Sequence, residues 1–290
     1  MTNAIAHFNG EFLPLDAIRI SPLDRGFVFG DGVYEVIPVY GGRPLRGRAH
    51  FERLQRSMDE IRLVNPHTVD EWMAITMKLL ESHPGNQSVY IQVSRGAPPK
   101  RDHVIPVGLQ PTVFMMCYPL ASPSNEQVDA GVACVSAKDF RWEKCHIKST
   151  SLLGNVLARQ ISADAGAVET ILFRDGFLTE ASASNAFIVK NGVVAAPPQD
   201  HMILLGITYD LLARLAKEGA IRLEIRPITE AEVRDADELW LSSSTKEVLA
   251  VTTLDGKPVG GGKPGPMFRR MHALYQEHKA KLASPESVAA

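Results

Sequence analysis

The stretch CHIKSTSLLGN at residues 145–155 decides the fold that we predict for this chain. Its lysine, Lys148, follows a predicted strand and stands directly before an apolar-periodic run over 149–165 that predicts a helix. Burial and the positive end of a helix dipole both disfavour an ammonium ion there, which biases the amine towards its neutral, nucleophilic form. A solvated lysine at a helix start is the alternative, because most lysines are exposed. Lys148 is therefore a candidate for imine formation with an aldehyde.

A second informative stretch, LTEASASN, occupies residues 178–185. Small residues surround Glu180 and would let the backbone approach a flat ligand closely. A carboxylate beside a ring nitrogen holds a proton on that nitrogen. A glutamate in a polar hairpin is the alternative, and it would be favoured if Lys148 stood alone.

Together the two stretches resemble the cofactor-holding segments of the fold-type IV pyridoxal-phosphate enzymes, also called class IV aminotransferases. The resemblance covers roughly residues 5–275. It implies the cofactor pyridoxal 5'-phosphate, with Lys148 as the Schiff-base lysine and Glu180 as the carboxylate that keeps the ring nitrogen protonated. It also implies an α+β fold with a small α/β domain, a larger β-barrel-like α/β domain and the site between them. A homodimer whose loops complete the neighbour's site is implied as well.

Three places along the chain have features of a phosphate site. A predicted helix begins at Thr208, expected as its N-cap, and helix N-termini offer free N–H groups and a positive dipole end. Residues 243–245, SST, precede a predicted helical turn, and Arg53 lies on a predicted helix over 50–63 as a possible charged clamp. Each feature alone is weak evidence for phosphate binding, because serine and threonine are common helix caps and an arginine such as Arg53 is by default a solvated helix residue.

In the family these three places converge on the cofactor phosphate, and their order along this chain is the same. The resemblance therefore assigns phosphate binding to Arg53, Ile207, Thr208, Ser243 and Ser244. It also implies that Leu204 packs against the cofactor ring.

The substrate side of the site separates the subfamilies. Residues 29–36, FGDGVYEV, resemble the family's N-terminal strand, whose tyrosine, here Tyr34, points into the site; a half-buried core tyrosine is the alternative. Arg101 and His103 resemble the α-carboxylate trap of D-amino acid aminotransferases, since a fixed guanidinium can hold a carboxylate by two parallel hydrogen bonds and an imidazole adds a donor. A charged, mobile loop is the alternative for this pair. Pro38 stands where related enzymes often carry a basic residue, which could alter side-chain preference.

Two further charged residues belong to these segments. Arg25, in the N-terminal block, is interpreted as structural, paired with acidic neighbours near a dimer contact. Glu169, after the predicted helix that follows Lys148, could tune Lys148 or the cofactor network.

Composition and charge argue against several classes of protein. The formal net charge of -2 and the pI near 6.5 argue against nucleic-acid or membrane-surface partners, and no apolar run approaches the roughly 18 residues that span a bilayer. The start, MTNA, lacks the basic and apolar blocks of a signal peptide. Three cysteines form an odd set without metal-ligand spacing, so we expect reduced thiols, no metal site and a cytoplasmic protein.

Periodicity and turn residues predict the order of elements. In the first half we expect a hairpin around Asn9-Gly10, then strands and helices over 33–40, 50–63, 69–83, 88–94 and 112–120. In the second half we expect strands and helices over 131–136, 149–165, 170–196, 208–218 and 238–242, then a terminal helix and a frayed tail. A cluster of proline, serine and asparagine predicts a small domain over 1–120, a linker over 121–125 and a large cofactor-binding domain over 126–290.

These features predict a D-amino acid aminotransferase that exchanges amino groups between D-alanine- or D-glutamate-type substrates and 2-oxo acids by a ping-pong mechanism, with Lys148 as proton shuttle. Three activities on the same scaffold are alternatives: a branched-chain L-amino acid aminotransferase, an (R)-amine transaminase and aminodeoxychorismate lyase. The pair of Arg101 and His103 argues against each. A catalytically inactive binding or structural dimer is the alternative from another class, and the intact Lys148 and Glu180 argue against it.

Overall fold

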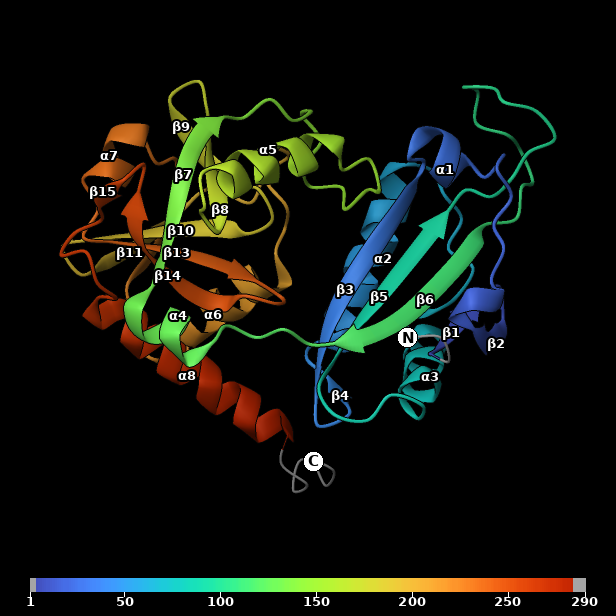
Figure 1. Ribbon diagram of the computed structural model, residues 1–290, viewed down its shortest axis with the longest axis horizontal. Coiled ribbons are helices and arrows are strands. Elements are labelled where there is room, and N and C mark those ends of the chain that lie inside the picture. Colours follow the sequence, from blue (N-terminus) through green and yellow to red (C-terminus); the bar gives the residue numbers. More distant parts are fainter. Residues whose placement is uncertain (1–3, 284–290) are drawn as a thin grey trace. The chain divides into compact units, whose positions relative to one another are not determined.

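The computed structural model describes residues 4–283 and divides into two compact units (Figure 1). The first unit contains residues 4–120, 147–152 and 282–283, and the second contains 121–146 and 153–281. The segment with Lys148 therefore belongs by its contacts to the first unit, and Glu180 belongs to the second. The predicted frayed tail lies outside the described residues.

The first unit is built on a six-stranded antiparallel sheet with the order β2-β1-β6-β5-β3-β4. Its strands are β1 (Ile5–Phe8), β2 (Glu11–Pro14), β3 (Gly32–Tyr40), β4 (Arg43–Pro44), β5 (Gln87–Ser94) and β6 (Thr112–Pro119). The predicted Asn9-Gly10 turn is confirmed, because both residues have positive φ, 47° and 95°, as a two-residue hairpin turn requires.

Helices cover one face of this sheet (Figure 1). The unit contains the 3-10 helix η1 (Leu15–Ala17) and the helices α1 (Arg25–Phe29), α2 (Gly47–Glu60) and α3 (Val69–Leu80). Phe51 and Leu54 of α2 and Trp72 of α3 are fully buried against alternate residues of β3 and β5. On the opposite face of the sheet, Tyr34 and Val36 are half-buried, because successive side chains along a strand point to opposite faces.

The second unit contains a larger, curled sheet with the order β12-β11-β10-β13-β14-β7-β8-β9, and β15 pairs with β14. Its strands are β7 (Val132–Lys138), β8 (Glu169–Arg174), β9 (Phe177–Ala181), β10 (Asn185–Lys190), β11 (Val193–Ala196), β12 (Leu223–Ile225), β13 (Glu238–Ser243), β14 (Glu247–Leu254) and β15 (Lys257–Pro258). Strand β7 runs parallel to both β14 and β8, and β9 also lies against β10, which curls the sheet into a half-barrel. The fold is thus the predicted α+β class.

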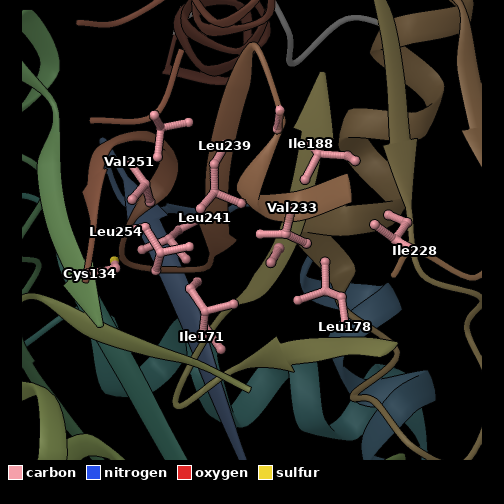
Figure 2. Close-up of a cluster of buried hydrophobic side chains, with 14 of the residues drawn as sticks. Cys134, Ile171, Leu178, Ile188, Ile228, Val233, Leu239, Leu241, Val251 and Leu254 are labelled. Atoms are coloured by element: carbon pink, nitrogen blue, oxygen red, sulfur yellow. The ribbon is translucent and has the colours of Figure 1, made fainter. Parts of the chain in front are cut away.

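The second unit also contains helices, several of which pack against the strands of this sheet. They are α4 (Asn125–Ala130), α5 (Leu153–Asp164), α6 (Ile207–Glu218), α7 (Glu230–Arg234) and α8 (Pro266–Ala283). Inside the curled sheet, Ile171, Leu239, Leu241 and Val251 converge in one apolar core, which Figure 2 shows. This core fixes the strands whose ends carry Glu180 and the Ser243–Ser244 turn.

The environment predicted for Lys148 is wrong in two respects. A turn, not a strand, precedes it, and α5 begins at Leu153 rather than directly after Lys148. Residues 149–152 are instead non-helical and held against the first unit, because Ser149 bridges Val33 and the Thr150 N–H donates to the Gly32 carbonyl at 2.9 Å. A helix dipole acts mainly within the first turn, so it does not act on Lys148 as we expected.

Two features of the predicted phosphate site also differ from expectation. The N-cap of α6 is Gly206, whose backbone is extended, and Thr208 already lies within the helix. The turn after β13 is a hairpin rather than a helical turn, because Ser243 pairs with Glu247 of β14 and Glu247 takes a positive φ of 56°. Because β13 and β14 pair up to Ser243 and Glu247, only residues 244–246 remain to connect them.

The described range lacks two kinds of feature. Among the helices of residues 4–283, none is long and apolar enough to cross a membrane. Over the same part of the chain, no group of three or more His, Cys, Asp or Glu side chains is arranged to hold a metal ion.

Candidate active site

Lys148 is held by its backbone on the first unit. Its N–H donates to the Ser57 hydroxyl at 3.2 Å, and its carbonyl accepts the Tyr34 N–H at 3.0 Å. Its Nζ atom lies 4.2 Å from the centre of the Tyr34 ring. The structure therefore brings the predicted lysine and tyrosine together, with the half-buried amine over the aromatic face, an arrangement that attracts an ammonium ion.

A buried charged cluster lies in the same unit. Glu35 is completely buried and accepts Arg53 Nε at 2.7 Å and Arg53 Nη2 at 2.8 Å, while His50 Nδ1 lies 2.7 Å from Glu35 Oε2. Glu35 is on β3, and the other two residues are on α2. The predicted phosphate ligand Arg53 thus has its charge compensated by a bidentate carboxylate.

The cluster fixes the charge states of its members. Burial alone would raise the pKa of Glu35, but Arg53 and His50 outweigh burial and place the pKa of this carboxyl far below its usual value. For His50, burial is the largest effect and lowers the pKa, with Glu35 opposing it only partly. Glu35 is therefore held as the anion beside the Arg53 cation, while burial disfavours the charged form of His50.

Arg25 organises the loop that carries Arg101 and His103. Its Nε donates to Asp31 at 2.7 Å, and its Nη1 donates to the backbone carbonyl of Asp102. The Arg101 guanidinium lies 4.6 Å from the centre of the Phe29 ring, and the His103 ring lies 5.0 Å from it. The predicted ion pair of Arg25 with an acidic neighbour is confirmed, and the Arg101 and His103 side chains are exposed against one aromatic ring.

Glu180 is the centre of a second polar cluster, on the second unit. Its Oε1 accepts Arg141 Nη1 at 2.5 Å, and its Oε2 accepts Asn185 Nδ2 and the Leu204 N–H, each at 3.1 Å. Arg141 is itself held by both carboxylate oxygens of Asp139, which is fully buried. The carboxylate of Glu180 therefore has a fixed orientation and acceptor capacity for a further donor.

Burial dominates the protonation of Glu180. It raises the pKa of this carboxyl, and Arg141 with the Leu204 N–H oppose only part of that effect. A carboxylate that is costly to bury gains from any additional N–H donor placed at a free lone pair. The cluster is thus suited to bind a protonated ring nitrogen.

The N-terminus of α6 lies against the same cluster. Asn185 Nδ2 also donates to the Leu204 carbonyl at 3.0 Å, and a Cβ atom on Gly206 would lie 2.1 Å from Asn185 Oδ1. The close approach explains why glycine stands at this N-cap. Ile207 and Thr208 follow as the first buried residues of the helix.

The remaining predicted phosphate ligands lie in the β13–β14 hairpin. Ser243 is the last residue of β13, and its hydroxyl accepts the Lys246 N–H at 3.1 Å. Ser244 is half-exposed in the turn. The predicted residues thus form two groups, one in each unit. Lys148 contacts Tyr34 in the first unit, and Glu180 contacts Leu204 in the second.

Sequence reasoning missed residues that hold the predicted ones in place. Arg141 gave no signal, because its link to Glu180 spans 39 positions. Glu35 did give one, since it shares the buried face of β3 with Val33 and Ile37, where a charge requires a partner. His50, on α2 near Arg53, is the second member of that partner set.

Comparison with known proteins identifies the family. The family model for amino-transferase class IV matches residues 32–254. The chain belongs to the class IV aminotransferases. Three curated relatives are D-alanine aminotransferases. That of Bacillus licheniformis is 36% identical over 270 residues, covering 93% of this chain and 95% of the relative. That of Staphylococcus aureus strain MW2 is 37% identical over 272 residues, covering 93% and 96%. That of Listeria monocytogenes is 38% identical over 257 residues, covering 88% and 89%.

Solved structures of class IV aminotransferases share this fold. The branched-chain amino acid aminotransferase of Escherichia coli superposes with a TM-score of 0.91 at 23% identity, covering 98% of this chain and 97% of that one. The branched-chain amino acid aminotransferase of Thermobaculum terrenum, solved in its PLP form, gives a TM-score of 0.86 at 22% identity, covering 97% and 95%. At these identities the likeness concerns the fold.

Proposed function

We propose that this class IV aminotransferase is a pyridoxal 5'-phosphate-dependent transaminase that exchanges amino groups between D-amino acids, of the D-alanine and D-glutamate type, and 2-oxo acids. The curated relatives named above support the D-amino acid branch. The structural observation that carries the proposal is the placement of Arg101 and His103 against Phe29, on a loop whose backbone Arg25 holds. A guanidinium and an imidazole so placed form a binding site for a carboxylate.

The residues present fit the proposed cofactor. Glu180 offers a buried carboxylate with an oriented free lone pair, which suits a pyridinium N–H. Lys148 offers an amine held by its backbone on both sides. Leu204 is half-buried and tied to Glu180 through its N–H, so it is proposed to pack on the ring.

Phosphate binding is proposed for the residues at the two turns of the second unit, together with one arginine. The N-terminus of α6 has an N-cap without a side-chain hydrogen bond, which favours an anion at its N–H groups. The proposed phosphate ligands are Arg53, Ile207, Thr208, Ser243 and Ser244. Arg53 enters this role with its guanidinium already oriented by Glu35.

Lys148 carries the proposed proton transfer. Bound pyridoxal phosphate would supply an electron sink for the charge that develops at the substrate Cα. The Lys148 amine would hold the cofactor in the resting enzyme, and once freed by substrate it would take the Cα proton as a base and deliver it as an acid. The Tyr34 ring beneath Nζ would orient the amine, and Arg101 and His103 would set which enantiomer presents its Cα proton. Both half-reactions of the ping-pong cycle would use these same groups.

We further propose a cytoplasmic homodimer. Along α5, Leu153, Val156, Leu157 and Ile161 recur at helical spacing and are 72%, 59%, 51% and 38% exposed, an apolar stripe typical of a protein interface. Light scattering should show a dimer that Leu157→Glu weakens. Met77→Glu, at an exposed apolar position of α3, should leave the dimer intact.

The three cysteines are free and buried, which supports the proposed cytoplasmic location, a reducing compartment.

A half-reaction titration tests the proposed activity. The purified protein is loaded with cofactor and mixed separately with D-alanine, L-leucine and (R)-1-phenylethylamine, and its visible absorption band is followed. Bleaching by D-alanine alone is expected, and Lys148→Ala should abolish turnover. Conversion of L-leucine instead would assign the protein to the branched-chain group.

Matched variants in one loop test the carboxylate site. Arg101→Met and His103→Leu should each raise KM for D-alanine, because each removes every side-chain donor to the substrate carboxylate. Lys100→Gln removes a charge that is 79% exposed in the same loop and should leave KM unchanged. If all three variants raise KM equally, Arg101 and His103 do not bind the carboxylate directly and act only through the charge of the loop.

A further inference from the structure

Lys246 is a charged residue that the proposed chemistry does not use. It lies in the β13–β14 hairpin, two residues after Ser244. Its Nζ atom lies 2.6 Å from Oε1 of Glu169, and the Lys246 side chain is only 23% exposed. An ion pair of this kind differs from the many exposed pairs of the molecule, because Glu169 is completely buried.

Glu169 organises a turn with its carboxylate. Oε2 accepts the Ser182 hydroxyl at 3.0 Å and the Ala183 N–H at 2.7 Å, and Oε1 accepts the Ser184 hydroxyl at 2.5 Å. Every residue of the 182–184 turn thus donates to one buried carboxylate. Without Lys246 that carboxylate would lose its ion-pair partner, which is strongly unfavourable in a protein interior.

The 182–184 turn lies between Glu180 and Asn185, which hydrogen-bond to each other in the Glu180 cluster. Glu180 lies two residues before the turn, and Asn185 directly follows it. The Ala181 N–H donates to the Ser184 carbonyl at 2.7 Å, and Asn185 Nδ2 donates back to Glu180 at 3.1 Å. A displacement of the turn therefore displaces the carboxylate of Glu180 and one of its donors together.

We propose that Lys246 is a positioning residue for Glu180. Through Glu169 it fixes the 182–184 turn, and it ties that turn to the hairpin that carries Ser243 and Ser244. The proposed partner of the ring nitrogen, Glu180, and two proposed phosphate ligands, Ser243 and Ser244, are thereby held at fixed positions relative to one another. The proposal rests on the proposed function only in assigning Glu180 and the serines to the cofactor.

Four variants separate this role from general stability. Lys246→Met keeps the aliphatic stem but leaves Glu169 without its cation. Lys246→Met/Glu169→Gln removes the unpaired charge while retaining an oxygen that can accept the Ala183 N–H. Lys246→Arg restores a cation of different shape. Lys257→Met, at an exposed lysine of β15, is the matched control.

Hydrogen–deuterium exchange of the cofactor-free protein is the first readout, because it does not depend on activity. Amides of peptides covering 180–186 should exchange faster in Lys246→Met than in wild type, and Lys257→Met should match wild type. The double variant should recover much of the protection, and Lys246→Arg should recover part of it. Unchanged exchange in Lys246→Met would overturn the proposal.

Cofactor affinity and kinetics are the second readout. Lys246→Met should bind pyridoxal phosphate more weakly, and kcat for D-alanine should fall on the order of a hundredfold with a smaller change in KM, as expected when a reacting group is misplaced by about an ångström. Faster exchange with wild-type affinity and kcat would also overturn the proposal. Failure of the wild-type protein to bind the cofactor or convert D-alanine would instead refute the proposed function, and the exchange data would still decide whether Lys246 holds the turn.

Discussion

Replacing Gly206 with alanine should disturb the Glu180 cluster without touching a charged group. The added Cβ would lie 2.1 Å from Asn185 Oδ1, whereas ordinary contact begins at 3.4 Å, so the Asn185 amide must move by about 1.3 Å. The other close neighbour, Tyr209 Cβ at 3.1 Å, belongs to the first turn of α6 and gives little room for the helix to retreat. The amide of Asn185 is therefore the group that shifts.

The cost follows from the two hydrogen bonds that the Asn185 amide donates. One goes to the Glu180 carboxylate at 3.1 Å and one to the Leu204 carbonyl at 3.0 Å. A bond to a charged group contributes roughly 1.5–3 kcal/mol and a neutral one roughly 0.5–1.5 kcal/mol. Gly206→Ala should therefore lower the free energy of unfolding by about 2–4 kcal/mol. The proposed cofactor should bind at least about tenfold more weakly, a difference of about 1.4 kcal/mol.

Urea unfolding followed by tryptophan fluorescence measures the first quantity, and titration of the cofactor-free protein measures the second. Gly261→Ala is the matched control, because its new Cβ would meet nothing within 4 Å. It should leave both quantities near their wild-type values. If Gly206→Ala unfolds at the same urea concentration as Gly261→Ala and binds cofactor equally well, then the close approach of Asn185 does not constrain Glu180 as argued.

Two further predictions concern the first unit. Burial lowers the pKa of His7 to about 4, so the unfolded chain binds the proton first as pH falls; the stability from neutral His7 is complete above pH 6.5 and is lost towards pH 4. When the pH is lowered from 7 to 5, the free energy of unfolding of His7→Gln, measured in urea, should therefore fall by roughly 1–2 kcal/mol less than that of wild type. His201→Gln, at an exposed histidine, should keep the wild-type pH dependence. Equal falls in the two variants would contradict the assignment to His7. Glu35→Gln removes the carboxylate that compensates the buried Arg53 charge and should cost about 3–5 kcal/mol of unfolding free energy. Glu52→Gln, at an exposed position next to Arg53 on α2, should cost less than about 0.5 kcal/mol.

The local elements could be predicted from the sequence because their signals are local. The predicted turn at Asn9-Gly10 is confirmed, with positive φ at both residues, and the same Asn-Gly pair forms a turn of this kind at residues 191–192. The helix expected over 50–63 is α2 at Gly47–Glu60, since its apolar period matches one buried face. Helix α4, which we did not predict, is six residues long and buries none of them, so it left no apolar periodicity.

The environment of Lys148 could not be predicted in the same way. The apolar run after it is compatible with a helix from residue 149, yet Thr150 donates its hydroxyl to the Gly30 carbonyl at 2.9 Å, and the helix begins only at Leu153. That contact spans 120 positions. A helix start set by a partner so distant leaves no trace in the local pattern, and the predicted dipole effect on Lys148 is wrong for this reason.

By itself, the sequence determined the α+β class, the family and the two segments that carry Lys148 and Glu180, because residue types at fixed short spacings identify them. Only the tertiary structure decided what each residue contacts. Arg141 follows β7 and reaches Glu180 because β7 pairs with β8 and β8 pairs with β9, and Lys246 reaches Glu169 from a separate hairpin. Buried charges require partners, but the identity of the partner depends on which distant segments the core brings together.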